Sequence, residues 1–212
     1  MKMVPRLLTG IVLAAGLATA ASAQTKWDMP TPYPDGNFHT KNVIAFAADV
    51  DKATNGSLKI QVHSAGSLIK HPEIKRAVRQ GTAPIGEILE SLASNEAPVY
   101  GLDSVPFLTT GYDSAKKLYA VSKPYLEKQL ASEGLTLLYS VPWPPQGIYA
   151  KKDVNALSDM QGVKFRSYNV ATAKLAEMSG AVPVQIEAAE LSQALATGVV
   201  ESFISSGATG YD

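Results

Sequence analysis

The 212-residue sequence contains no cysteine, so no disulfide bond can contribute to its stability. Structural zinc sites usually depend on cysteine thiolates, and a cysteine-free sequence therefore argues against such a site. A chain of this length can bury enough apolar surface to fold without covalent cross-links. We therefore expect an ordinary hydrophobic core, with neither a metal nor a disulfide framework.

Local signatures of catalysis are also absent. The sequence has no G-x-S-x-G elbow, no Walker-type phosphate loop and no dinucleotide-binding glycine motif after a strand. Its three histidines, His39, His63 and His71, lack H-E-x-x-H spacing, and we interpret each as a neutral surface residue. We expect no cofactor. A catalytic triad needs no local motif, so these absences do not by themselves exclude a hydrolase.

Neither sign of charge is in excess. The sequence has 19 basic and 19 acidic residues, and removal of residues 1–23 takes away Lys2 and Arg6, which leaves 17 basic residues against 19 acidic ones. Proteins that bind nucleic acids present a basic face to the phosphates. Nucleic acid is therefore not expected as a partner.

The N-terminal segment has the pattern of a secretory signal peptide. Lys2 and Arg6 form a positive region before an apolar run, Leu7 to Ala18, that is too short to span a bilayer comfortably. Ala21-Ser22-Ala23 then has the small-x-small pattern of a cleavage site. An N-terminal membrane anchor is the alternative. We expect residues 1–23 to be removed before Gln24 and the protein to be exported to the bacterial periplasm.

Beyond the leader, the hydrophobic pattern alternates between helices and strands, which is typical of an α/β protein. Residues 38–54 have the apolar period of a helix, and Leu58, Ile60 and Val62 then alternate with polar residues as in a strand. Further helices are predicted for residues 72–80, 114–132, 170–179 and 190–197. Pro124 is expected to divide the second of these into two helices. Further strands are predicted for residues 26–29, 84–89, 135–141, 148–150, 163–166, 182–186 and 199–204.

Two segments on opposite sides of the proline-rich stretch 142–147 repeat one pattern. Residues 73–81 and 190–198 both begin with Glu, carry Ala at the same place and end with Gly, and each is followed by an apolar run. We interpret the chain as two α/β domains, residues 24–143 and 144–212, each with a mostly parallel sheet flanked by helices and with a cleft between them. Helix–glycine–strand order is common in α/β proteins, so a coincidence is the alternative.

Arg166 is the main candidate for a binding residue. Val163 and Phe165 alternate with Lys164 and Arg166, so Arg166 leaves the strand near its carboxyl end, on the face opposite the apolar pair. Ligands of open α/β sheets bind beyond these strand ends. A guanidinium there matches a carboxylate or phosphate with two parallel hydrogen bonds. An exposed arginine in a weak surface ion pair is the alternative.

Two functions fit these observations. One is a periplasmic binding protein whose cleft captures an anionic solute. The other is a secreted α/β enzyme that acts on a small anionic substrate. A thermal-shift assay with a panel of organic acids would distinguish them, because a binding protein is stabilised by its ligand through mass action.

Short motifs along the whole sequence resemble the solute-binding subunits of TRAP transporters, the dicarboxylate-type periplasmic receptors. They occur in family order, and they are T-N-G-x-L-K-I at residues 52–60, G-x-L at 65–68, P-F-L at 105–108, D-L-x-G-x-K-x-R at 159–166, G-A-x-P-V at 180–184 and A-L-x-T-G-V-V at 194–200. The resemblance implies a two-domain fold, similar to periplasmic binding proteins, that closes around an organic acid. It implies transport without catalysis, with membrane permease subunits as partners.

The resemblance also assigns roles to individual residues. In the family, the arginine of K-x-R clamps the ligand carboxylate, and Arg166 occupies that position. Many members have a second binding arginine just after the domain crossing, where this sequence has Gln146 instead. We therefore expect a monocarboxylate rather than a C4-dicarboxylate. The other candidate ligand-binding residues are Trp143, Tyr149, Asn169, Glu87, Ser205 and Ser206.

Several of these candidates have an equally simple alternative role. Trp143 and Tyr149 could lie against an apolar or aromatic ligand body, but Trp143 could equally pack in the hinge. Glu87 could accept a hydrogen bond from a ligand hydroxyl or amine, or only pair with a neighbouring lysine. Ser205 and Ser206 could hydrogen-bond a hydroxyl or a carboxylate.

Family members usually continue well beyond the point that corresponds to Asp212. The resemblance therefore implies that the C-terminal part of the second domain is missing from this sequence. On that basis we expect lower stability, and weak or no ligand binding, for the 212 residues alone.

Overall fold

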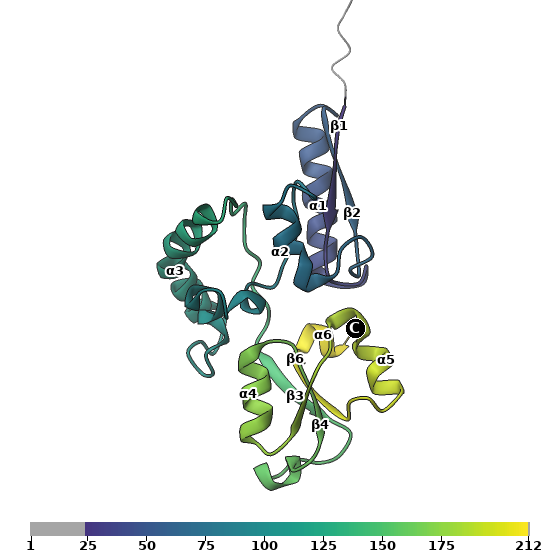
Figure 1. The fold of residues 1–212 in the computed structure, drawn as a ribbon, viewed down its shortest axis with the longest axis vertical. Coiled ribbons are helices and arrows are strands. Elements are labelled where there is room, and N and C mark those ends of the chain that lie inside the picture. Colours follow the sequence, from purple (N-terminus) through teal and green to yellow (C-terminus); the bar gives the residue numbers. More distant parts are fainter. Residues whose placement is uncertain (1–23, 212) are drawn as a thin grey trace, which may run out of the picture.

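The computed structural model describes residues 24–211, and it has the α/β architecture that the sequence predicts. The predicted signal peptide lies outside the described residues. Figure 1 shows an upper body built on one sheet and a lower body built on another, with a long helix at the side of the upper body. Within the described residues, no helix is both long and apolar enough to cross a membrane.

The upper body is built on two parallel strands. β1 (Thr25–Pro30) pairs with β2 (Leu58–His63), and helix α1 (Phe38–Ala53) connects them. The helix begins where the Asn37 side chain accepts a hydrogen bond from the His39 amide, and it is followed by Asn55 and Gly56, which both have positive φ. The core between helix and sheet consists of Met29, Val43, Ala47, Ile60 and Ile85.

The segment after β2 forms helix α2 (His71–Arg79), the short 3-10 helices η1 (Glu90–Ala93) and η2 (Pro98–Ser104), and the long helix α3 (Tyr112–Ser132). The prediction that Pro124 divides α3 is wrong, because α3 is one helix with Pro124 inside it. Beyond the proline, Leu126 and Leu130 are buried against η1 and η2, and this packing holds the helix in line despite the lost backbone hydrogen bond.

Two predicted strands of the upper body are not strands in the structure. Residues 84–89 and 135–141 lie outside regular elements. The first of these segments makes a single backbone bond to the sheet, from the Glu87 amide to the Pro30 carbonyl. An apolar extended segment becomes a strand only when a neighbouring strand offers a continuous ladder of partners, and hydrophobic pattern alone does not reveal that partner.

The lower body has a four-stranded sheet in the order β3-β6-β4-β5. Its strands are β3 (Gln146–Ala150), β4 (Lys164–Ser167), β5 (Val182–Gln185) and β6 (Ser202–Ser206). β4 runs parallel to both β5 and β6, and only β3 is antiparallel. The remaining elements are η3 (Leu157–Met160), α4 (Val170–Met178), η4 (Ala188–Glu190), α5 (Leu191–Ala196) and α6 (Gly207–Tyr211).

The direction of the strands positions the site. In Figure 1, β1 runs down toward the lower body, so the carboxyl ends of the upper strands face it. The carboxyl ends of β4, β5 and β6 share one edge because these strands are linked by parallel pairing. Residues just beyond these ends, from both bodies, line one cavity.

Candidate functional site

The cavity between the two bodies has a volume of about 50 Å³. Its walls come from both bodies. The upper body contributes Tyr33, His71, Leu89 and Trp143. The lower body contributes Gln146, Arg166, Tyr168, Glu187, Ala188, Ser205, Ser206 and Thr209.

Arg166 is a buried cation fixed by the backbone. Only 4% of the residue is exposed, so the alternative of an exposed surface arginine is wrong. Nε donates a hydrogen bond of 2.8 Å to the Ile186 carbonyl, and Nη1 donates one of 2.9 Å to the Ile204 carbonyl. The ring of Tyr168 lies under the guanidinium, with its centroid 4.8 Å from Cζ.

In the part of the chain that the structure describes, no carboxylate lies within ion-pair distance of Arg166. The Glu187 carboxylate acts on the guanidinium only at longer range, and it raises the pKa of Arg166 less than burial lowers it. Burial lowers the pKa of Arg166, but an arginine does not lose its proton in a protein. A charge removed from water without a partner is costly, and a bound anion would compensate it.

Glu187 and His71 join the two bodies at the cavity wall. His71 Nδ1 lies 3.0 Å from Glu187 Oε2, and His71 Nε2 lies 3.0 Å from the Leu89 amide nitrogen. Because the amide can only donate, Nε2 is the acceptor and the ring proton is on Nδ1. Burial alone would raise the pKa of Glu187, but the hydrogen bonds from His71 and Gln185 hold it below its ordinary value. Glu187 is therefore an anion at neutral pH.

Aromatic rings form the upper wall. Trp143 packs edge-on against Tyr33 with centroids 5.1 Å apart, and it also contacts Phe38 and His39. Trp143 therefore packs at the crossing between the bodies, as one alternative predicted, and it also lines the cavity. Burial raises the pKa of Tyr33 well above its ordinary value, so its phenol stays neutral.

The structure brings together five of the residues selected from the sequence. Trp143, Gln146, Arg166, Ser205 and Ser206 all line the cavity. Gln146 Oε1 accepts a hydrogen bond of 3.2 Å from the Tyr168 hydroxyl, so the side chain is held at the rim. Direct contact between these residues and a ligand stays a prediction.

The other three selected residues do not line this cavity. Tyr149 stacks on Phe203 on the sheet, with centroids 4.7 Å apart. Asn169 caps α4 and donates a hydrogen bond of 2.9 Å to Ser91 of the upper body. Glu87 lies 3.5 Å from His39 Nδ1 and accepts a short hydrogen bond from the Thr31 hydroxyl. The alternative of a lysine partner for Glu87 is therefore wrong.

The interpretation of all three histidines as surface residues is also wrong for two of them. His39 is 4% exposed and His71 is 6% exposed. His39 lies among the rings around Trp143, and His71 is hydrogen-bonded to Leu89 and Glu187. Across residues 24–211, no group of three or more acidic or histidine side chains could hold a metal ion.

Comparison with known proteins agrees with this architecture. Residues 31–212 match the model of a family described as bacterial extracellular solute-binding protein, family 7. The chain belongs to this family. The resemblance to TRAP solute-binding subunits that the motifs indicate is confirmed.

Several members of the family have been solved with a ligand. DctP6 of Bordetella pertussis, an extracytoplasmic solute receptor that binds pyroglutamic acid, is 57% identical with a TM-score of 0.86, over 89% of this chain and 62% of that one. A marine metagenome TRAP solute-binding protein specific for pyroglutamate is 55% identical with a TM-score of 0.86, over the same shares of the two chains. A curated solute-binding protein of Albidiferax ferrireducens is 26% identical over 81% of this chain and 51% of its own length. The chain thus spans less than two thirds of these relatives.

Sequence reasoning missed seven residues that line the cavity: Tyr33, His71, Leu89, Tyr168, Glu187, Ala188 and Thr209. His71 and Glu187 are 116 residues apart, and no local pattern connects them. Tyr168 offered one signal, because it follows the Arg166 strand directly and therefore lies near the same carboxyl end. Tyr33 lies in a proline-rich loop after β1, at the equivalent end of the upper sheet.

Proposed function

We propose that the protein is the extracytoplasmic solute receptor of a TRAP transporter and that it holds a small monocarboxylate in the cavity between its two bodies. Residues 24–143 and 144–212 would act as the two domains that close around the solute. The observation that carries the proposal is Arg166, a buried guanidinium fixed by two carbonyls and facing a cavity with no carboxylate paired to it.

Family membership supports a receptor rather than a secreted enzyme. The relatives point to the same chemistry, since the two most similar ones described above bind pyroglutamate. Pyroglutamate carries one carboxylate, and in the described residues Arg166 is the only arginine or lysine that lines the cavity. A single fixed cation suits one carboxylate better than two. Pyroglutamate is therefore the solute we propose to test first.

The partners follow from the same family. The receptor would deliver its solute to the membrane permease subunits of the transporter, and it would meet them in the periplasm. Export by the predicted signal peptide of residues 1–23 is part of this proposal.

The test is calorimetric titration of the purified full chain, freed of bound solute, with pyroglutamate. We expect saturable binding at one site. Arg166→Ala should weaken the affinity at least about 30-fold, because it removes the partner of a desolvated carboxylate. The matched control is Arg79→Ala, an exposed arginine of α2 that lies away from the cavity.

If the parent protein binds pyroglutamate and Arg166→Ala binds it equally well, Arg166 is not the carboxylate anchor. If neither pyroglutamate nor any other monocarboxylate binds or raises the melting temperature at millimolar concentration, the proposed function is wrong.

A further inference from the structure

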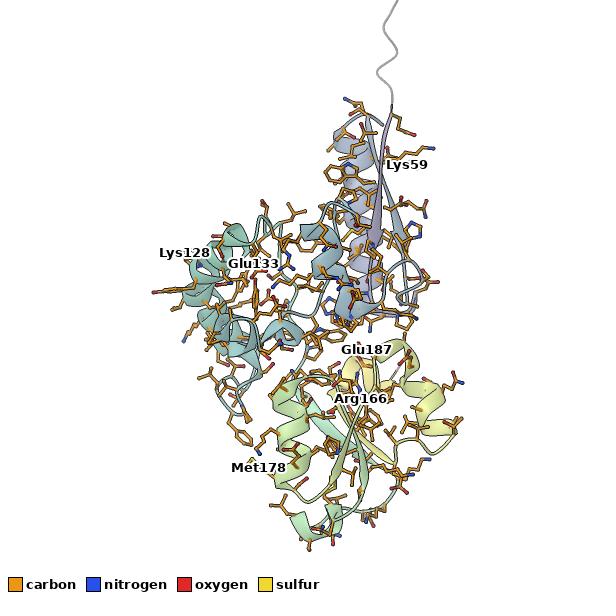
Figure 2. All side chains as sticks on the ribbon, in the orientation of Figure 1. Lys59, Lys128, Glu133, Arg166, Met178 and Glu187 are labelled. Carbon is orange, nitrogen blue, oxygen red and sulfur yellow. The ribbon has the colours of Figure 1, made fainter. Side chains whose placement is uncertain are left out.

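Glu187 is a second charged side chain in the cavity, and it has no role in the proposed binding of a carboxylate by Arg166. Figure 2 shows Glu187 and Arg166 at the end of the lower body that faces the upper one. Glu187 follows the end of β5, and both side chains line the cavity. One wall therefore offers a fixed cation and an anion to the same cavity.

His71 holds this carboxylate in place from the opposite body. Its Nδ1 is 3.0 Å from Oε2 of Glu187, and the ring cannot turn away without losing the 3.0 Å bond that Nε2 accepts from the Leu89 amide. The His71 side chain is 5% exposed and that of Glu187 is 24% exposed, so the histidine is the anchored member. His71 is thus a positioning residue for Glu187.

An ionised carboxylate can only accept hydrogen bonds. A ligand atom that faces Glu187 must therefore be a donor, and a second ligand carboxylate at this place would be repelled. Arg166 requires the opposite chemistry, because a guanidinium can only donate. Together, Arg166 and Glu187 therefore favour a ligand that has an acceptor group, the carboxylate, and a hydrogen-bond donor close to it.

We infer that Glu187, positioned by His71, selects the solute by reading a hydrogen-bond donor next to its carboxylate. The inference rests on the proposed function and narrows its ligand class to monocarboxylates with a neighbouring N–H or O–H group. The lactam N–H of pyroglutamate, on the atom bonded to the carboxylate-bearing carbon, is such a donor.

A matched pair of ligands tests this directly. Pyroglutamate and 5-oxotetrahydrofuran-2-carboxylate have the same ring, carbonyl and carboxylate, but the second has a ring oxygen in place of the N–H. We expect the full chain to bind the lactam about 10- to 100-fold more tightly by calorimetry, because the ring oxygen offers Glu187 no donor and turns its lone pairs toward the carboxylate.

Two variants then assign the preference to its residues. Glu187→Gln should reduce the lactam-to-lactone ratio to about 3-fold or less, since an amide can turn either a donor or an acceptor to the ligand. His71→Asn should lower the same ratio, whereas a purely structural role would weaken both ligands equally. The control is Glu190→Gln, an exposed glutamate three residues further on that does not line the cavity.

The outcomes separate this inference from the proposed function. Equal affinity of the parent protein for lactam and lactone overturns the inference without any variant, even if a variant fails to fold. An unchanged ratio in a folded Glu187→Gln protein overturns it as well. In both cases loss of binding in Arg166→Ala would still support the receptor function.

Discussion

Two cations of this molecule, the half-buried Lys75 and the buried Arg166, have opposite surroundings. Lys75 Nζ lies 2.6 Å from a Glu133 oxygen and 2.8 Å from a Glu96 oxygen, over the ring of Tyr100. Arg166 lies over a ring too, but it donates its hydrogen bonds to two carbonyls, and no carboxylate of the described residues lies within ion-pair distance of it. Figure 2 shows how far apart the two places are, with Glu133 in the upper body and Arg166 in the lower one.

The pKa directions follow this difference. Burial would lower the pKa of Lys75, but its two carboxylate partners raise it above the ordinary value. The pKa of Arg166 is lowered by burial, and the nearby Tyr168, Glu187 and Tyr33 offset this only in part. Lys75 therefore has the internal partners of a structural charge, while Arg166 has no carboxylate at ion-pair distance in the described residues, as the proposed ligand anchor requires.

The largest effect on stability is expected where the pair is complete. Lys75→Met should lower the free energy of unfolding by about 2 to 4 kcal/mol, because it leaves the poorly exposed Glu133 carboxylate without its cation. Urea denaturation of the ligand-free protein measures this loss. Lys128→Met, at an exposed position of α3, is the control and should change stability by less than about 0.5 kcal/mol. Equal effects of both substitutions would contradict a structural role for Lys75.

A smaller loss of stability is expected at the incomplete pair. Arg166→Met breaks no ion pair of the described residues and should lower the free energy of unfolding of the ligand-free protein by about 1 to 2 kcal/mol, because two carbonyls lose their donors.

Arg166→Lys should keep the charge but weaken carboxylate binding about 10-fold, because an ammonium lacks the planar fork. Urea denaturation and calorimetric titration of the same samples separate the two effects. Full affinity in Arg166→Lys would show that charge alone is enough.

The smallest effect is expected at Glu90, a partly buried acid that can become neutral by taking up a proton. Burial and the nearby Asp103 raise the pKa of Glu90 to about 7. The native state then holds a proton that the unfolded chain releases, so this contribution to stability is present at low pH and is lost as pH rises toward 7. Because the side chain is only partly buried, we expect a loss of about 1 kcal/mol between pH 5 and pH 8.

Glu90→Gln should remove this part of the pH dependence, since an amide does not titrate in this range. The measurement is urea denaturation of parent and variant at pH 5 and pH 8, with Glu127→Gln on the exposed face of α3 as control. A variant whose stability still falls as steeply as that of the parent would assign the dependence to other groups, of which Asp103 is the nearest candidate.

Much of the local structure follows from the sequence. The helix at residues 38–53 and the strand at 58–63 follow directly from their hydrophobic periods, and Asn55 with Gly56 marks the end of that helix. The predictions fail where a segment depends on distant partners. Residues 84–89 lack a continuous strand partner, and Pro124 is tolerated because Leu126 and Leu130 pack beyond it.

The candidate site could likewise be predicted from the sequence only in part. Strand alternation and the K-x-R motif identify Arg166 as the candidate anchor, and the absence of an arginine at Gln146 favours one carboxylate over two. Glu87 and Asn169 were selected by their positions near strand ends. Only the structure shows that Glu87 meets His39 and Thr31, and that Asn169 bonds to Ser91.

The sequence by itself determined the order of elements, the family and the position of one guanidinium at a strand end, because periodicity and short motifs depend on neighbouring residues. Only the tertiary structure decided that Arg166 is buried without a carboxylate while Lys75 has two. It also decided that His71 meets Glu187 across 116 residues. The contact between His71 and Glu187 arises only where the two bodies pack, and burial there makes the presence or absence of a partner count for each charge.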